Sequence, residues 1–138
     1  FLFASPAYLA EHGRPETPEE LKEHNCLVFM LATKTNIWTL SNRAASHVVQ
    51  VSGDLRANNS LLVLQSVLAD RGVANLASFV IQPYVDEGRI ELLLPDYQAE
   101  RLSLYAVYPE RQYMPPKVSL FIEFFQGWLS ENLQQTLG

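Results

Sequence analysis

A chain of 138 residues with a net charge of -5 at neutral pH can build one hydrophobic core, but it lacks the clustered positive charge that gripping nucleic acid requires. Its hydrophobic content of 48% is that of an ordinary soluble protein, and no apolar run approaches the roughly 18 residues of a membrane span. The single cysteine, Cys26, excludes an internal disulfide and a multi-cysteine metal site, and it is compatible with a reducing compartment.

The first predicted elements are a strand and a short helix. Residues Phe1 to Ala4 are apolar and read as the end of a strand that starts further upstream, so we expect the chain to be part of a longer protein. Ser5 followed by proline is typical of a helix start, and Gly13 is typical of a helix stop. This pattern predicts a helix from Pro6 to Glu11.

A second helix is predicted by the sequence Thr17-Pro18-Glu19-Glu20, which fits a capping box. In this motif Thr17 caps the helix, the proline takes the first helical position, and Glu20 reaches back to a free backbone N–H group. We expect a short helix that ends near Glu23.

Three stretches of strand length follow. Asn25 to Leu31 is an apolar run, which predicts a buried strand. Ile37 to Leu40 and His47 to Val51 alternate between apolar and polar residues, as half-buried antiparallel strands do.

The segment from Asn58 to Pro95 is the one around which we expect the rest of the chain to be built, because it contains two helix-then-strand units in series. In the first unit, apolar residues at three- and four-residue spacing predict one buried helix face. Gly72 would supply the positive φ at which helices commonly stop, and a buried strand from Val73 to Leu76 should follow. The predicted face consists of Leu61, Leu64, Val67 and Leu68.

The second unit repeats this pattern. Ser78 is the expected cap, Phe79 to Glu87 the helix, Gly88 the stop, and Arg89 to Leu94 the strand. Helices that alternate with apolar strands imply an α/β fold with parallel neighbouring strands.

The last predicted elements are a strand and a long helix. Leu102 to Tyr108 alternates as a strand, and Lys117 to about Gln135 reads as a helix with a broad apolar stripe. The stripe is either core or, because it is wide for one small domain, a surface for a partner. It consists of Val118, Phe121, Ile122, Phe125, Trp128 and Leu129.

The residues that could carry chemistry do not form a catalytic pattern. His12, His24 and His47 fall on separate elements without the spacing of a metal site, so we expect surface or capping roles. Cys26 opens an apolar strand and reads as a buried structural thiol. With no nucleophile elbow, phosphate loop or dinucleotide fingerprint, we expect no catalytic residue, no metal and no cofactor.

The polar cluster Asn58-Asn59-Ser60 has two interpretations. All three residue types cap helices, which is a sufficient structural reason for their presence. Three in succession exceed what one cap needs, however, and ligands of open α/β folds sit near helix N-termini, where anions are favoured. The sequence leaves capping alone and capping with ligand contact as open alternatives.

Several segments support a family assignment together. The chain contains, in this order, SPAYLAEHGRPETPEELKEHNCL, the strand at Trp38, VSGDLRANNS, the turn at Gly72, DEGRIELLLPDY and YAVYPERQYMPPKVSLFIEFF. Over nearly the full chain these segments resemble the effector-binding domain of LysR-type transcriptional regulators. The likeness is greatest to the subgroup with an SPAYL-x-x-H-G segment and a Y-P-x-R-x-x-x-P-P-K tail.

The resemblance implies an α/β fold like that of type 2 periplasmic binding proteins, in which two subdomains are joined by two crossover strands. Residues 5–101 would form the second subdomain. Residues 1–4 and 102–138 would supply the crossover strands and part of the first subdomain, which is incomplete in this chain. The family's winged helix-turn-helix and dimerising linker helix would precede Phe1.

The resemblance also implies function: a cytoplasmic sensor, not an enzyme, that binds a small-molecule effector between its subdomains. DNA would be bound only through the N-terminal domain, and the protein would be a dimer or tetramer. A small anion is the effector type that a helix N-terminus favours. The alternative is a periplasmic-type solute-binding protein of a transport system. The expected effector contacts are Asn58, Asn59, Ser60, Ser5 and Met30.

Overall fold

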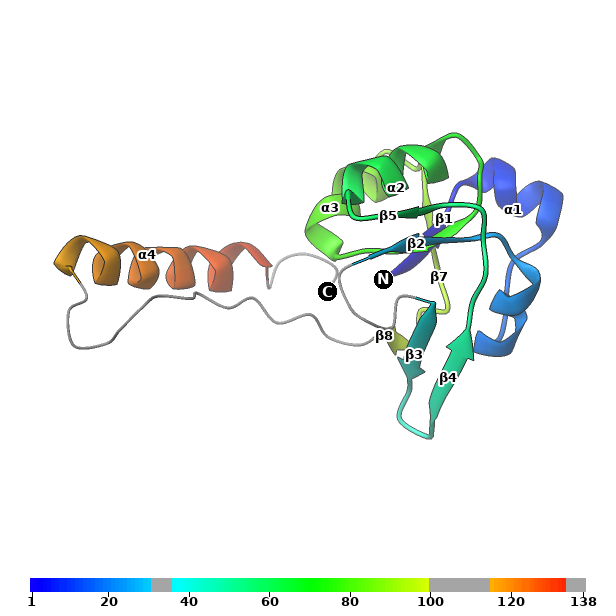
Figure 1. The fold of residues 1–138 in the computed structure, drawn as a ribbon, viewed down its shortest axis with the longest axis horizontal. Helices are drawn as coiled ribbons and strands as arrows, with labels where there is room; N and C mark the ends of the chain where they lie inside the picture. The colour runs from blue at the N-terminus through cyan, green and yellow to red at the C-terminus, as the bar shows by residue number, and fades with distance from the viewer. Residues whose placement is uncertain (31–35, 100–114, 134–138) are drawn as a thin grey trace. The chain divides into compact units, whose positions relative to one another are not determined.

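The computed structural model describes residues 1–30, 36–99 and 115–133 and divides into two compact units, Phe1–Arg101 and Leu102–Gly138 (Figure 1). The first unit contains two sheets with helices around them, and the second contains one helix. In chain order the elements are β1 (Leu2–Ala4), α1 (Pro6–His12), η1 (Pro18–Glu23), β2 (Cys26–Phe29), β3 (Ile37–Ser41), β4 (Ser46–Gln50), β5 (Arg56–Ala57), α2 (Ser60–Leu68), β6 (Val73–Asn75), α3 (Ser78–Asp86), β7 (Glu91–Leu93), β8 (Gln98–Ala99) and α4 (Pro116–Leu133).

The larger sheet has five strands in the order β5-β2-β6-β1-β7. β2 is parallel to both β5 and β6, as the alternation of helices and strands predicted. β1, by contrast, is antiparallel to both of its neighbours, β6 and β7. The chain does not cross the sheet between β1 and β2, so β2 starts at the edge where β1 ends. The sheet is therefore mixed rather than wholly parallel.

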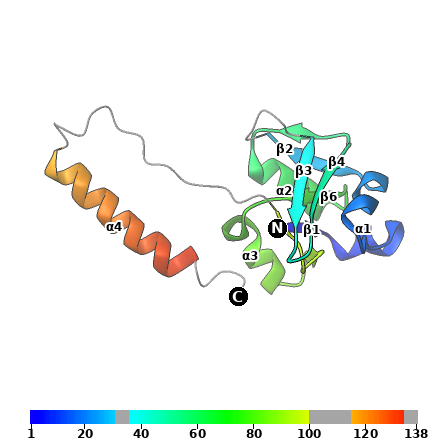
Figure 2. The same ribbon diagram turned by 90° about the horizontal axis from the view of Figure 1, so that it is seen from below.

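Alternating residues of the strands fill two separate cores, one on each face of this sheet. Phe3, Leu27 and Ala74 point into the core beneath α2 and α3. Their neighbours in the strands, such as Cys26 and Val28, point into the core shared with α1, η1 and the second sheet. Figure 1 shows α2 and α3 side by side on one face of the sheet, and Figure 2 looks onto the hairpin of β3 and β4 on the other.

The second sheet has the order β4-β3-β8, with β3 antiparallel to both neighbours. Trp38 and Leu40 in β3 and Val49 in β4 are buried. Val48, the neighbour of Val49 in the same strand, is 69% exposed. The prediction of half-buried antiparallel strands is confirmed.

Helix α1 begins at Pro6, as the sequence predicted, and ends at His12, one residue later than predicted. The Ser5 hydroxyl oxygen accepts a hydrogen bond from the Tyr8 N–H at 3.2 Å. Gly13 takes the left-handed conformation at the other end, with φ of 83°, and its N–H donates to the Leu9 carbonyl oxygen at 2.9 Å. These local bonds replace the ones that a helix lacks at its ends.

The predicted capping box is wrong in detail, because residues 18–23 form a 3₁₀ helix and the Thr17 side chain does not cap it. Instead, the Glu20 carboxylate accepts hydrogen bonds from the Glu16 N–H at 2.8 Å and from the Thr17 hydroxyl at 2.9 Å. These two bonds lower the pKa of Glu20. The Glu20 carboxylate thus binds the two residues before the helix. The Thr17 hydroxyl donates to this carboxylate and does not accept from the helix as a cap would.

Gly72 has a positive φ, 159°, as predicted, but the prediction that it stops α2 is wrong. The residue in the left-handed conformation is Asp70, with φ of 60°, and the helix ends at Leu68. Gly72 has a different reason to be glycine: a Cβ atom there would lie 2.1 Å from the Asn25 backbone carbonyl oxygen. The chain therefore needs glycine at this position for close approach rather than for a turn.

Helix α3 is capped by the backbone of Ala77, so Ser78 is its first residue rather than its cap. Gly88 ends this unit with φ of 67°, as predicted. The strand that follows is shorter than expected, because Leu94 adopts the left-handed conformation, with φ of 49°, and turns the chain toward the second sheet.

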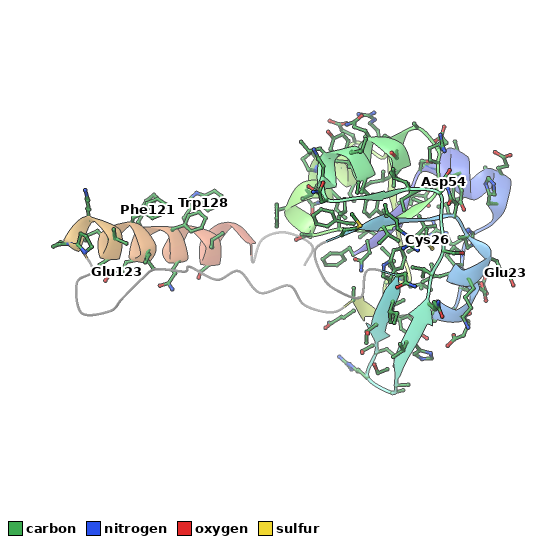
Figure 3. The ribbon with its side chains drawn as sticks, viewed as in Figure 1. Glu23, Cys26, Asp54, Phe121, Glu123 and Trp128 are labelled. Carbon is green, nitrogen blue, oxygen red and sulfur yellow. The ribbon has the colours of Figure 1, made fainter. Side chains whose placement is uncertain are left out.

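Helix α4 covers most of the predicted final helix, whereas the predicted strand from Leu102 to Tyr108 lies outside the described residues. The rings of Phe121, Phe125 and Trp128 stack in succession, with centroids 5.8 and 6.2 Å apart. Figure 3 shows Phe121 and Trp128 on one side of α4 and Glu123 on the opposite side.

Candidate functional site

The carboxyl ends of β2 and β5 lie next to each other, because these strands are parallel with Phe29 opposite Ala57. The Met30 N–H donates to the Ala57 carbonyl oxygen at 2.8 Å, so Met30 leaves the sheet beside the start of the Asn58 segment. We call residues 30, 58–62 and 76–79 the carboxyl edge. Ligands of open α/β folds bind at such an edge.

Asn59 is the cap of α2. Its Oδ1 accepts hydrogen bonds from the N–H groups of Leu61 at 2.9 Å and Leu62 at 3.3 Å. Within the described residues its amide nitrogen has no protein acceptor, and the exposed Asn58 side chain has no partner at all. Ser60 is the first helical residue and is half-buried. Capping therefore accounts for one oxygen of the cluster and leaves the Asn58 amide group available.

A second helix start, which the sequence analysis did not assign to the site, lies at the end of β6. The Leu76 N–H donates to the Phe1 carbonyl oxygen at 3.1 Å, which fixes this strand end. Helix α3 then begins without a side-chain cap. The signal that could have located it is the polar Asn75 at the end of an apolar strand, because a parallel neighbour of β2 must end at the same edge.

Large apolar side chains remain exposed in the first turns of both helices. Leu61 is 62% exposed and Phe79 63% exposed, and Met30 at the end of β2 is 42% exposed. The prediction that Leu61 belongs to the buried face of α2 is wrong, and Val63 takes that place. The carboxyl edge thus presents amide and hydroxyl groups together with apolar side chains, the usual composition of a small-molecule site.

Ser5 lies at the opposite edge of the sheet. Because β1 is antiparallel to β7, with Ala4 opposite Glu91, Ser5 follows at the edge where β7 begins. Its side chain is 3% exposed, and its hydroxyl caps α1. We call residues 5–9, 24–26, 52–54 and 70–73 the amino edge. The structure brings Met30 together with residues 58–60 and separates Ser5 from them.

Cys26 is fully buried at the start of β2, as predicted, and Figure 3 shows it inside the fold. Its thiol donates to the Leu21 carbonyl oxygen at 3.3 Å, and burial raises its pKa to about 12. A thiol that stays protonated is not a nucleophile. Cys26 is therefore a packing residue.

The predicted surface role does not hold for His24, which is 9% exposed, although it does cap the end of η1. His12 is exposed, and His47 lies 2.7 Å from a Glu19 carboxylate oxygen at the surface. In residues 1–30, 36–99 and 115–133 no three His, Cys, Asp or Glu side chains are grouped to hold a metal ion.

A shallow concavity of about 440 Å³ lies between η1 and β4 and is lined by Lys22, Val48, Gln50, Val51 and Ser52. The Ser52 carbonyl oxygen accepts from the N–H of the first residue of β2, so this concavity adjoins the amino edge rather than the carboxyl edge. It does not involve the predicted contact residues. Among the described helices, none has the length and apolar character needed to cross a membrane.

Comparison with known proteins gives a consistent family. The model of the LysR substrate binding domain matches residues 1–130. The HTH-type transcriptional activator TtdR of Escherichia coli is 33% identical over 133 residues, which are 96% of this chain and 43% of that protein. The HTH-type transcriptional regulator PtxR of Pseudomonas aeruginosa is 34% identical over 129 residues, 94% of this chain and 41% of that protein.

Solved structures agree with this result. Full-length AphB, a virulence activator of Vibrio cholerae, matches with a TM-score of 0.78 and 26% identity over 92% of this chain and 43% of that chain. The CrgA regulatory domain of Neisseria meningitidis matches with a TM-score of 0.70 and 26% identity over 96% of this chain and 63% of that chain. The chain spans less than half the length of the curated relatives it matches.

Proposed function

The chain belongs to the family of LysR substrate binding domains, and from this membership we propose that it is the effector-sensing part of a bacterial transcriptional regulator. Its α/β fold is of the type 2 periplasmic-binding-protein class. The observation that carries the proposal is the family match over residues 1–130. The matched proteins are transcriptional regulators, so a transport protein is not favoured, and they are not enzymes.

The whole protein would bind DNA through a helix-turn-helix domain outside this chain. The names of the relatives support this assignment, as does the fact that the chain corresponds to less than half of their length. The net charge of -5 fits a domain that does not itself contact the phosphate backbone. The regulator would act in the cytoplasm as a dimer or tetramer.

We place the effector at the carboxyl edge, against Met30, Asn58, Asn59 and Ser60. The support is their common position at the ends of parallel strands and the Asn58 amide group, which has no partner among the residues that the structure describes. Ser5 is left out because its buried hydroxyl is engaged at the amino edge. In this proposal residues 5–101 are the second subdomain, and residues 1–4 and 102–138 provide the crossover strands and part of the first.

Sensing would work by a shift of populations between two angles of the subdomains. An effector that binds one angle more tightly biases the equilibrium only by the ratio of its two affinities. In an oligomer, a change of angle alters the spacing of the DNA-binding domains, which couples the effector site to the operator site.

The test is a thermal-shift screen of small carboxylates and other metabolites on the intact regulator, repeated with variants of the carboxyl edge. Asn58→Ala removes an amide that bonds to none of the described residues, and Asn59→Asp keeps the capping oxygen while it replaces the amide nitrogen with an anionic oxygen. Both should reduce the stabilisation that a ligand of the parent protein gives.

Gln65→Ala is the matched control, because Gln65 is exposed on the same helix beyond its first turn. It should leave ligand stabilisation unchanged. If Asn58→Ala and Asn59→Asp respond to the ligand as fully as the control does, the proposed site is wrong.

A further inference from the structure

A buried hydrogen-bonded cluster at the amino edge joins α1 to the start of β2. The Tyr8 hydroxyl oxygen lies 3.1 Å from the Asn25 backbone nitrogen and 3.2 Å from Nδ1 of His24. Tyr8 is 2% exposed and His24 9% exposed. The ring of the exposed His12 stacks on the Tyr8 ring, with centroids 4.3 Å apart. The Tyr8 phenol of α1 therefore contacts His24, at the end of η1, and Asn25, the residue before β2.

These contacts determine where the protons are. The Asn25 N–H can only donate, so the Tyr8 oxygen accepts there and its own proton needs a different acceptor. Among the described residues, that acceptor is Nδ1 of His24. An imidazole nitrogen accepts only when it carries no proton, so this hydrogen bond requires a neutral His24 with its proton on Nε2.

His12 is in the opposite tautomer. Its Nδ1 lies 3.2 Å from the Tyr8 carbonyl oxygen, which can only accept, so this nitrogen carries a proton. Protonation of the second ring nitrogen of His12 would leave that bond intact. The two histidines therefore differ in what a proton does to them, although both contact Tyr8.

We propose that the Tyr8–His24 hydrogen bond is an acid-sensitive latch between α1 and the end of η1, closed while His24 is neutral and opened when His24 takes up a proton. Protonated imidazole has N–H groups at both ring nitrogens and can no longer accept. The Tyr8 oxygen then faces two N–H donors, those of His24 and Asn25, and its own buried proton is left without an acceptor among the described residues.

The groups around His24 set the balance of the latch. Burial has the largest effect and lowers the pKa of His24, and the neighbouring His12 lowers it further. Glu20 and Glu23, both on η1, favour the protonated form and oppose this shift. From β2 the Cys26 thiol faces the cluster, and it is neutral because burial raises its pKa to about 12.

The latch gives the fold a pH dependence of definite sign. A histidine whose pKa is lower in the folded state than its unfolded value of about 6.5 stabilises the fold fully above that value. This stability is lost as the pH falls through the folded pKa. Opening the latch would remove the bond from α1 to His24 at the end of η1, while the Asn25 N–H can still donate to the Tyr8 oxygen.

The first test uses histidine nitrogen NMR on the intact protein, with resonances assigned from His12→Gln and His47→Gln variants. We expect the Nε2–H tautomer for His24 and titration below about pH 6.5. The Gly13 amide, which donates to the Leu9 carbonyl oxygen in α1, should lose about fivefold in protection against exchange, relative to the intrinsic rate at the same pH, once His24 is protonated. This change corresponds to the loss of one ordinary hydrogen bond. An Nδ1–H tautomer for His24 or titration at or above about pH 6.5 overturns the latch.

The second test compares melting temperatures at about pH 7.5 and about pH 5.5, on either side of the unfolded histidine value. The parent protein should lose more stability in acid than His24→Gln, which cannot take up a proton. His12→Gln is the matched comparison, since it removes the other histidine on the same tyrosine. It should keep most of the parent's acid loss, because burial, the larger cause of the lowered pKa of His24, is still present. Equal acid losses in the parent and His24→Gln contradict the proposal. If His24→Gln does not fold, the NMR titration of the parent decides.

Discussion

The two edges of the main sheet use the same residue types in opposite ways. At the amino edge the Asn25 side chain is fully engaged: its oxygen accepts from the Asp54 N–H at 3.0 Å, and its amide donates to Asp54 and to the Arg71 carbonyl oxygen. At the carboxyl edge the Asn58 side chain has no partner within the described residues. Polar groups that bond to one another stabilise a fold, whereas unpaired ones at the ends of parallel strands are available to a ligand.

The largest expected effect tests the crowding of the amino edge. In Gly72→Ala the new Cβ would lie 2.1 Å from the Asn25 carbonyl oxygen, and both atoms belong to the backbone or are fixed to it. Because neither can move without shifting a strand, we expect a loss on the order of 3 kcal/mol in the free energy of unfolding, measured by urea denaturation. Gly127→Ala in α4 is the control: its Cβ meets nothing within 4 Å, and it should gain up to about 1 kcal/mol. A Gly72→Ala protein as stable as the parent would show that the edge can relax.

The second prediction compares the two asparagines directly. Asn25→Ala removes three side-chain hydrogen bonds that connect β2 to the loops at Asp54 and Arg71, so we expect a loss of about 2 kcal/mol in unfolding free energy. Asn58→Ala should change it by less than about 0.5 kcal/mol, as is usual for an exposed side chain without a partner. Equal losses in chemical denaturation would remove the contrast between the edges.

The smallest effect concerns Asp70, which holds a left-handed conformation with φ of 60° between α2 and β6. Asp70→Gly should stabilise the fold by up to about 1 kcal/mol, because glycine adopts this conformation without strain. Asp70→Ala is the control and should not stabilise, since alanine has the same Cβ. A rise in melting temperature for both variants would mean that the aspartate charge, rather than its backbone, is unfavourable.

Some helix ends were predictable from the local sequence, whereas the Thr17 cap, the Gly72 stop and the Ser78 cap were not. The starts and stops at Ser5, Gly13 and Gly88 follow from bonds between residues within four positions of each other, and the structure confirms them. The reason for Gly72 could not be predicted, because the carbonyl oxygen that it approaches belongs to Asn25, far away in the sequence.

The residues that meet in the candidate site could be predicted only where the direction of their strands could be predicted. Met30 and Asn58 come together because β2 and β5 are parallel, which the alternation of helices and strands implied. Ser5 lies at the other edge because β1 is antiparallel to its neighbours. The three apolar residues of β1, Leu2–Ala4, do not indicate in which direction the strand runs. The Tyr8–His24 contact depends on how α1 packs, so no pattern in the sequence pointed to it.

The position of β1 has a mechanical consequence. Because this strand is hydrogen-bonded to β6 on one flank and β7 on the other, it cannot slide along its own axis without breaking both ladders at once. A push or pull along β1 is therefore shared at once by β6 and β7, one strand on each side.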